Sequence, residues 1–290
     1  MHADHHYEIG TSHPACEDYA LSGTRDGLTW AIVSDGCSSS KNTDVGARIL
    51  AHAAQKTLIG LSRKMTDEKF MKVSFCSVFY ELLQHRIQST RVSLGLDWDS
   101  LDATLLLAYA RAPLGILAQP LWGAMAIGDG HIVVSHGDGS KTHVGISYES
   151  GAPYYLSYNM CPEKDEGYRK AFGPDRKLRV CQTYHRPQGD PDVKEWTESP
   201  YAQISYCVDN VADPGFQPAQ ITLLSDGLGS FENCTWVQDT GQAVRAVTDY
   251  KALAGEFVRR RMRGFRKSYE PAGGSHYDDL ACAAITMVEA

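Results

Sequence analysis

The chain has 290 residues, 43% of them hydrophobic, which fits one large globular domain or two small ones. Acidic residues outnumber basic ones by 35 to 28, and a net charge of -7 argues against nucleic acid as the partner of the whole surface. The longest apolar runs, such as residues 103–110, are too short to span a bilayer, so we expect no membrane partner.

The cysteines and the N-terminal sequence indicate the compartment. Eight cysteines are scattered singly, without a Cys-x-x-Cys pair, and the opening residues lack the basic and apolar regions of a secretory signal. We therefore expect a reducing, cytoplasmic environment. Three histidines lie within residues 2–6, and we interpret them as part of a frayed terminus rather than a structural metal site.

The first half of the chain predicts strands and two helices. Residues 28–33 form a short apolar run that predicts a buried strand ending at Asp35. Two helices are predicted next, at residues 43–61 and about 67–88, with Asn42 or Thr43 as the first N-cap. Strands follow at residues 101–110 and 121–141, and Gly128-Asp129-Gly130 predicts a tight hairpin inside the second run.

The second half begins with a weaker pattern. Residues from about 141 to 219 are rich in Pro, Gly, Tyr and charge, so we expect a divergent, loop-rich insertion with strand-like pieces at 154–158 and 204–208. A strand at 220–225, a helix at about 242–263 and a last strand at 280–288 come after it. Because no linker or long repeat interrupts the chain, we predict a single domain over residues 1–290.

Acidic residues recur at the ends of the predicted strands. One Asp-Gly pair after a strand ordinarily makes only a turn. Several such carboxylates brought together would repel one another unless cations neutralised them. Carboxylate oxygens suit Mg²⁺ or Mn²⁺, and no His or Cys accompanies these acids at zinc spacing. The sequence therefore predicts a pair of divalent ions, held by acids drawn from these positions: Glu17-Asp18, Asp35, Asp129, Asp226 and Asp278-Asp279.

The same segments carry a family resemblance. CEDYA, WAIVSDGCSSS followed by GARIL, DATLLLAY, AMAIGDGHIVV, ITLLSDGLGSF and YDDLACAAITM occur in this order along residues 10–288. The sequence resembles the metal-dependent protein phosphatases of type 2C (PPM), and a divergent bacterial subgroup in particular. That resemblance implies an α+β fold, a four-layer α-β-β-α sandwich with two antiparallel sheets packed face to face and helices outside.

The resemblance also implies an activity. It predicts hydrolysis of phosphoserine and phosphothreonine in proteins, by a water or hydroxide that bridges two Mn²⁺ or Mg²⁺ ions, in opposition to a Ser/Thr kinase. The metal ligands implied are Asp35, which bridges the ions, the carbonyl of Gly36, Asp226 and Asp278. Asp129 would help to hold a weaker third ion. Glu17 would hold metal-bound water, with Asp18 beside it, and Asp279 ranks below Asp278.

Two positions depart from the better-known family pattern. His13 stands four residues before Glu17, where many relatives carry a phosphate-binding arginine. It could contact the phosphate or give a proton to the leaving group, or it could be a surface histidine before a proline turn. Cys37 stands where some relatives have a histidine, and it could be oxidisable or could only pack.

Other readings of the sequence stay open. Residues 259–267 place six basic residues near the end of a predicted helix, either as a solvated helix end or as a docking patch through Arg259, Arg260, Arg261 and Arg263. Two alternatives to a protein phosphatase are a binding or regulatory module that keeps the fold with little catalysis, and a phosphomonoesterase for small molecules.

Overall fold

The computed structural model describes residues 1–65, 74–112, 120–174, 177–188, 191–198, 204, 206–209, 218–234, 237 and 239–287. Two antiparallel sheets form its centre, in the strand orders β1-β14-β11-β6-β7-β8-β9 and β10-β5-β4-β3-β2. The seven-stranded sheet contains β1 (His2–Glu8), β6 (Gly130–Ser135), β7 (Lys141–Tyr148), β8 (Leu178–His185), β9 (Asp192–Glu198), β11 (Gln220–Leu224) and β14 (Leu280–Thr286). The five-stranded sheet contains β2 (Tyr19–Arg25), β3 (Leu28–Ser34), β4 (Leu105–Arg111), β5 (Leu121–Ile127) and β10 (Tyr206–Asp209).

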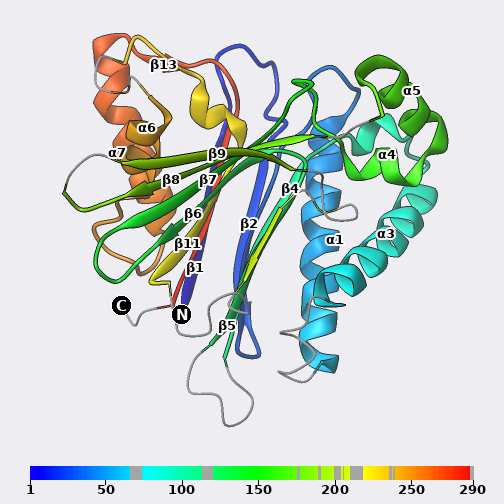
Figure 1. The fold of residues 1–290 in the computed structure, drawn as a ribbon, viewed down its shortest axis with the longest axis horizontal. Coiled ribbons are helices and arrows are strands. Elements are labelled where there is room, and N and C mark those ends of the chain that lie inside the picture. Colours follow the sequence, from blue (N-terminus) through cyan, green and yellow to red (C-terminus); the bar gives the residue numbers. More distant parts are fainter. Residues whose placement is uncertain are drawn as a thin grey trace.

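Helices cover the outer faces of both sheets, as Figure 1 shows. Helices α1 (Thr43–Lys64) and α3 (Ser74–Leu94) lie on the five-stranded sheet, while α6 (Thr240–Thr248) and α7 (Phe257–Tyr269) lie on the seven-stranded one. Two short helices, α4 (Leu156–Met160) and α5 (Pro162–Phe172), follow β7, and β12 (Phe231–Glu232) pairs with β13 (Ser275–His276). The four-layer α+β sandwich predicted from the sequence is confirmed.

Three layers of apolar side chains hold these elements together. Between the sheets pack residues such as Val33, Leu106 and Ile221, whereas Ile32 on β3 faces α1 and α3 on the other side. Every residue of β3 is therefore buried, because alternate side chains enter two different cores. This explains why its sequence is continuously apolar rather than alternating. A third layer, with Met262, lies between the seven-stranded sheet and helices α6 and α7.

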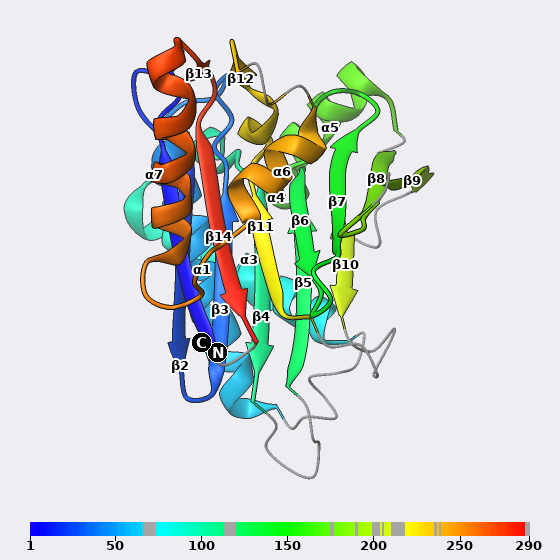
Figure 2. The ribbon, with the colours of Figure 1, turned by 90° about the vertical axis from the view of Figure 1, so that its left-hand side faces the viewer.

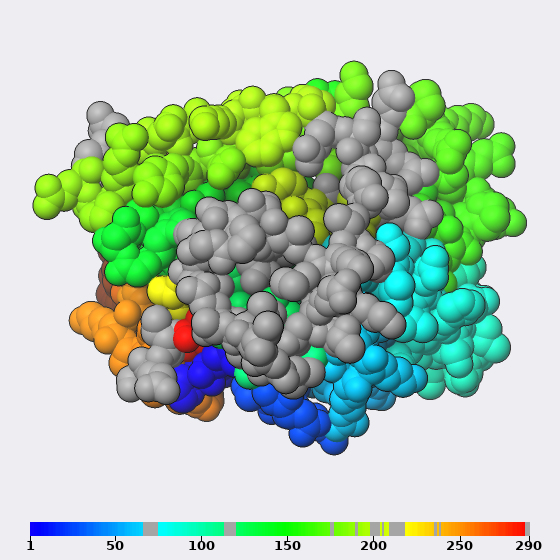
Figure 3. All heavy atoms as spheres, turned by 60° about the horizontal axis from the view of Figure 1, so that its bottom comes forward, coloured from blue at the N-terminus to red at the C-terminus, as the bar shows by residue number. Residues whose placement is uncertain are grey.

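The N-terminal prediction was wrong. Residues 2–8 form β1, which pairs along its whole length with β14, from His2 opposite Thr286 to Glu8 opposite Leu280. Figure 3 shows the start of β1, in blue, beside the end of β14, in red. The partner lies almost a full chain length away, so a local pattern could not reveal it.

The predicted hairpin at Gly128-Asp129-Gly130 was also wrong. β5 pairs with β4 and β10, whereas β6 pairs with β11 and β7, so the turn carries the chain from one sheet to the other. Both glycines have positive φ, 93° at Gly128 and 125° at Gly130, which other residues rarely adopt. The turn chemistry was therefore recognised correctly, but it does not determine which strands pair.

Several other boundaries differ from the sequence predictions. The segment expected to be loop-rich, 141–219, contains β7, α4, α5, β8, β9 and β10, and residues 156–160 are helical rather than a strand. The helix predicted at 242–263 is two helices, α6 and α7, separated by residues 249–256. The start of the second predicted helix, residues 67–73, lies outside the described residues.

Coverage of the seven-stranded sheet by helices is uneven, as Figure 2 shows. Helix α7 contacts β1 and β14 at one side of the sheet, and α6 packs beside α7. Strands β7, β8 and β9 extend beyond these helices. None of the described helices is long and apolar enough to cross a membrane.

Candidate functional site

The antiparallel register brings the predicted acids to one end of the sandwich. Ser34 at the end of β3 lies opposite Tyr19 at the start of β2, and Leu105 at the start of β4 lies opposite Ile127 at the end of β5. In the other sheet, Leu224 at the end of β11 lies opposite His131 near the start of β6, and opposite Cys282 near the start of β14. The turn at 128–130 joins these two ends, so all the strand-terminal acids lie along the same edge.

Four aspartates on this edge interact through their charges. Burial, together with the charges of Asp18 and Asp226, raises the pKa of Asp35 well above its usual range. Burial and the charge of Asp226 raise the pKa of Asp129 to about 7. Burial likewise raises the pKa of Asp18 to about 7, although its hydrogen bonds oppose the shift. Asp18, Asp35, Asp129 and Asp226 thus form an acidic group, in which burial and neighbouring charges disfavour the ionised forms of Asp18, Asp35 and Asp129.

Backbone contacts hold Asp35 and Gly36 in place. The amide N–H of Asp35 donates to Thr104 Oγ1 at 3.1 Å, and the Asp35 carbonyl accepts from the N–H of Thr104 at 2.8 Å. A Cβ atom on Gly36 would lie 2.9 Å from the carbonyl oxygen of Thr43 and 3.0 Å from that of Glu17. A side chain therefore has no room at residue 36, as expected for a position where the backbone must come close to other groups.

A second acidic group surrounds His13. Its Nδ1 lies 3.1 Å from Oδ2 of Asp279, and its Nε2 lies 3.3 Å from Oδ1 of Asp278. Glu17 is more distant, at 3.9 Å from Nδ1. Burial opposes the protonated imidazole, but the hydrogen bond to Asp279 and the three carboxylate charges outweigh it, so the pKa of His13 is raised. The structure thus places His13 among the acids rather than at an isolated surface position.

Asp279 is the buried member of this group. It is 3% exposed and accepts the backbone N–H of Gly10 at 2.7 Å and that of Glu17 at 2.6 Å. Asp278 is the more exposed of the two, with 35% of its side chain accessible. Burial and the charge of Asp226 raise the pKa of Asp278, which links this group to the four aspartates. The two neighbouring aspartates therefore have different surroundings, Asp279 being buried and Asp278 accessible.

Glu17 connects the acids to helix α1. Thr43 donates its hydroxyl to Oε1 of Glu17 at 3.1 Å, at the first residue of the helix. Burial raises the pKa of Glu17, while the hydrogen bond from Thr43 opposes the shift. The helix start and the acid therefore stabilise each other.

The chemistry of the donors fits a hard divalent cation. Their side chains offer only carboxylate oxygens, and a cation would relieve the repulsion that raises the pKa values of Asp18, Asp35 and Asp129. Over the described part of the chain, however, no group of three His, Cys, Asp or Glu side chains is arranged so that it could hold a metal ion. The residues nevertheless supply charge and donor atoms suited to such a cation.

Sequence reasoning missed two buried polar residues here. Ser225 donates its hydroxyl to Oδ2 of Asp18 at 2.6 Å and accepts the N–H of Ala281 at 2.9 Å, so it joins the two sheets. Asp102, 1% exposed, accepts from Ser157 at 2.5 Å and from Lys164 at 2.7 Å. In the sequence, only their positions in the motifs could have indicated these two residues. Ser225 directly precedes Asp226, and Asp102 is the first residue of the DATLLLAY segment.

Cys37 lies beside these contacts. Its N–H donates to the carbonyl of Asp102 at 2.8 Å, and its Sγ lies 3.1 Å from the hydroxyl of Ser39. Burial raises the pKa of Tyr155, which is also affected by Cys37 and by the charges of Asp129 and Asp35. Tyr155, from the segment expected to be loop-rich, therefore forms part of the surroundings of the acids.

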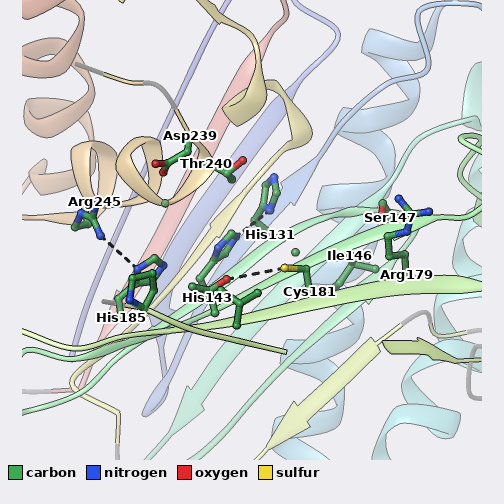
Figure 4. A pocket seen from close by; sticks show the side chains of 15 residues that line it. His131, His143, Ile146, Ser147, Arg179, Cys181, His185, Asp239, Thr240 and Arg245 are labelled. Atoms are coloured by element: carbon green, nitrogen blue, oxygen red, sulfur yellow. Dashed lines mark hydrogen bonds between the residues drawn. The ribbon is translucent and has the colours of Figure 1, made fainter. Parts of the chain in front are cut away.

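A cavity of about 510 Å³ opens on the outer face of the seven-stranded sheet, next to α6 (Figure 4). Three histidines, His131, His143 and His185, line it together with Cys181 and Arg245. Burial lowers the pKa of His131 to about 4, although the charge of Asp226 acts in the opposite direction. His131 therefore lines this cavity and is also close enough to Asp226 to be affected by its charge. No sequence motif indicated the cavity.

Comparison with known proteins identifies the family of this chain. The model of the protein phosphatase 2C family matches residues 6–152. The chain belongs to the protein phosphatase 2C family. The match includes Glu17, Asp18, Asp35 and Asp129, and it ends before Asp226 and Asp278. No curated protein sequence matches the chain.

Solved phosphatase structures resemble the fold. A bacterial serine phosphatase that carries a point mutation has 10% sequence identity and a TM-score of 0.53, with 100% of this chain and 99% of that chain covered. A phosphatase from Mycobacterium smegmatis in complex with cacodylate has 14% identity, 99% coverage of both chains and a TM-score of 0.48. A serine/threonine phosphatase from Staphylococcus aureus has 9% identity, 99% and 95% coverage and a TM-score of 0.49. At this identity the likeness concerns the fold alone, and the first comparison carries it.

Proposed function

We propose that this protein phosphatase 2C family member removes phosphate from phosphoserine or phosphothreonine in proteins, with two Mn²⁺ or Mg²⁺ ions at the acidic edge. The proposal includes residues 1–290 as one catalytic domain in the cytoplasm, acting against a Ser/Thr kinase. The observation that carries it is the group of buried aspartates at the strand ends, where burial and neighbouring charges, including that of Asp226, raise the pKa values of Asp18, Asp35 and Asp129.

The proposed metal ligands are the carboxylates of Asp35, Asp226 and Asp278 and the carbonyl of Gly36, with Asp129 and Asp18 at the margin of the site. When bound, the two cations would lower the pKa of a water molecule and neutralise charge on the phosphoryl group. The raised pKa values of Asp35 and Asp129 support this assignment, because a bound cation would offset the repulsion between neighbouring carboxylates.

The protein's own groups would position the substrate. His13, held by Asp278 and Asp279, would present an imidazolium near the phosphate and could give its proton to the departing seryl or threonyl oxygen. Asp279 would act through His13, because it fixes the imidazole and the backbone N–H groups of Gly10 and Glu17. Glu17, fixed by Thr43, would orient a metal-bound water molecule.

The proposed protein substrate would also need a docking surface, and helix α7 offers positive charge. Arg260 and Arg263 are exposed on this helix, while Arg259 pairs with Glu256 at 2.9 Å. Arg260 additionally donates to the carbonyl of Ala254 at 2.8 Å. We include Arg259, Arg260, Arg261 and Arg263 as a patch for acidic or phosphorylated segments.

The test is a phosphatase assay on protein stripped of metal and then resupplied with Mn²⁺. We expect hydrolysis of an aryl phosphate and of a phosphoserine peptide, and a loss of at least about 100-fold in Asp35→Asn and Asp226→Asn. Asp26→Asn is the matched control, since Asp26 is exposed and paired with Arg63 away from the acids. No turnover in the wild type, or equal turnover in Asp35→Asn, would refute the proposal.

A second candidate function is a binding or regulatory module with this fold and little catalysis. The feature that motivates it is His13, which stands where many relatives carry a phosphate-binding arginine. Calorimetric titration with Mn²⁺ separates the two, because metal uptake without hydrolysis of any phosphopeptide supports the module. Turnover of small phosphorylated metabolites but not of phosphopeptides would instead identify a small-molecule phosphomonoesterase.

A further inference from the structure

Two cysteines far apart in the sequence bring their sulfur atoms together. Cys76 lies in the first turn of α3 and Cys207 lies in β10, 131 positions further along the chain, yet their Sγ atoms are 3.3 Å apart. A disulfide has a sulfur–sulfur bond of about 2.05 Å. An approach of about 1.2 Å, within the reach of small side-chain rotations, would therefore allow a covalent bond.

The two thiols differ in their accessibility. Cys207 is exposed on β10, whereas Cys76 is buried, with 8% of its surface accessible. A dissolved oxidant can therefore reach Cys207 directly, while Cys76 is shielded behind it. This is the arrangement of a redox-sensitive cysteine with a resolving cysteine. The exposed thiol is oxidised first, and the neighbouring thiol then forms a disulfide with it before it can be oxidised further.

The other six cysteines contact different kinds of atoms. Their sulfur atoms lie near hydroxyl, carboxylate or carbonyl oxygens, in the pairs Cys16 with Asp18, Cys37 with Ser39, Cys161 with Glu163, Cys181 with Thr183, Cys234 with Glu232 and Cys282 with Tyr250. The close sulfur–sulfur approach of Cys76 and Cys207 thus distinguishes this pair and predicts selective cross-linking.

We propose that Cys76 and Cys207 form a reversible disulfide when the protein meets a hydroperoxide. The Cys207 thiolate attacks one peroxide oxygen and breaks the O–O bond, which gives a sulfenic acid. With hydrogen peroxide the leaving hydroxide takes up the proton that the Cys207 thiol released on ionisation, which gives one water. The sulfur of Cys76 then attacks the sulfenic sulfur, and the displaced hydroxide takes the Cys76 proton as a second water. Two thiols lose two electrons and the peroxide gains them, and a dithiol reductant reverses the reaction.

The bond would fasten a short edge strand to a helix. β10 has four residues and forms the edge of the five-stranded sheet, where it pairs with residues 123–126 of β5. Its register places Cys207 opposite Met125. A covalent link from β10 to α3 closes a long loop and reduces the freedom of the unfolded chain, so the oxidised protein should be the more stable form. A transient bond of this type also suits a reducing compartment.

The experiment maps the cross-link in the whole protein. Reduced protein is exposed to hydrogen peroxide, quenched with N-ethylmaleimide and digested with trypsin and Glu-C under non-reducing conditions. These proteases place Cys76 in residues 73–81 and Cys207 in residues 199–232, and each peptide contains one cysteine. We expect the two peptides to be joined, with loss of two hydrogen atoms, and to separate after dithiothreitol. Independent alkylation of both cysteines after oxidation would overturn the proposal.

Variants provide the second measurement. Cys207→Ser, an exposed substitution, should abolish the cross-link, whereas Cys234→Ser, which removes a cysteine with a different neighbour, should leave it intact. Peroxide should raise the melting temperature of the wild type by about 5 °C and that of Cys207→Ser not at all. A cross-link that persists in Cys207→Ser, or forms only between molecules as protein concentration rises, contradicts the intramolecular pair.

Discussion

His13 Nδ1 lies 3.1 Å from Oδ2 of Asp279, a carboxylate that is only 3% exposed. The same carboxylate accepts the backbone N–H groups of Gly10 and Glu17. Its removal would leave the partly buried imidazole of His13 without its nearest carboxylate and the backbone N–H groups of Gly10 and Glu17 without their acceptor. Asp279→Ala should therefore lower the free energy of unfolding by about 3 kcal/mol in urea titrations.

Asp278→Asn is the comparison for this prediction. Asp278 contacts the same histidine at 3.3 Å, but its side chain is 35% exposed. Solvent screens an ion pair of this kind, so the change should be under about 1 kcal/mol. Equal losses in the two variants would show that the backbone contacts of Asp279 do not stabilise the segment around His13.

Helix α1 contains two glycines with opposite surroundings. A Cβ atom on Gly46 would lie 1.6 Å from the backbone oxygen of Ser100, whereas one on Gly60 would meet nothing within 4 Å. Gly46→Ala should therefore destabilise the fold by about 3 kcal/mol or more, because the helix must move away from residues 99–101. Gly60→Ala should stabilise it by up to about 1 kcal/mol through helix propensity. Urea unfolding of both variants tests this. If both substitutions changed the free energy of unfolding in the same direction, the close packing of Gly46 against Ser100 would be contradicted.

The features that depend on local sequence patterns were the ones predicted from the sequence. The strand ending at Asp35 was recognised because both faces of β3 are buried, which makes the run continuously apolar. The acids were recognised as a set because strand ends of an antiparallel sandwich meet at an edge, and the resemblance supplied their order. The charge of Asp226 contributes to the raised pKa of Asp35, which agrees with that grouping.

Long-range pairing accounts for the errors. β1 is a strand only because β14 lies beside it, and residues with turn preferences at 128–130 can join two sheets as readily as two strands of one sheet. Residues 156–160 have β-forming tyrosines nearby, yet they form a helix whose Ser157 donates to the buried Asp102. In each case a contact with a distant part of the chain determined the structure.

His143 makes stability depend on pH. Burial lowers its pKa to about 2, and the charges of His131 and His185 act in the same direction. The unfolded chain, with a histidine pKa of about 6.5, binds a proton in the window between these values that the folded chain does not. Stability from this group is therefore present above pH 6.5 and falls by about 1.4 kcal/mol per pH unit as the pH drops below it.

His143→Asn should remove that slope. Between pH 6.5 and 5 the wild type should lose about 2 kcal/mol more than the variant, measured by urea titration at each pH. Raised aspartate pKa values act in the opposite direction in both proteins, so the difference between them isolates His143. The exposed His85→Asn serves as the control and should follow the wild type. Parallel pH profiles for wild type and His143→Asn would refute the assignment.

Lys164 binds two carboxylates of different burial. Its Nζ lies 2.5 Å from Oδ1 of Asp99, whose side chain is 59% exposed. It also lies 2.7 Å from Oδ2 of Asp102, whose side chain is 2% exposed. Asp102→Asn should cost about 3 kcal/mol, because it leaves the ammonium and the hydroxyl of Ser157 with poorer acceptors in a buried place. Asp99→Asn should cost less than about 1 kcal/mol. Thermal or urea unfolding distinguishes them, and a larger loss in Asp99→Asn would reverse the order of burial inferred here.

Asp35 should destabilise the metal-free protein and stabilise the metal-loaded one. Its folded pKa is raised well above the unfolded value, so the folded chain binds more protons than the unfolded chain between the two. Stability from this group is present at low pH and is lost as the pH rises through the folded pKa. In metal-free buffer at pH 8, Asp35→Asn should therefore melt at a higher temperature than the wild type, because the amide carries no charge to repel Asp18 and Asp226. Saturating Mn²⁺ should reverse the order, since ligand at 100 times its Kd stabilises the wild type by about 2.7 kcal/mol and the variant lacks the bridging carboxylate. A variant less stable than the wild type in both conditions would mean that Asp35 supports the fold rather than a cation site.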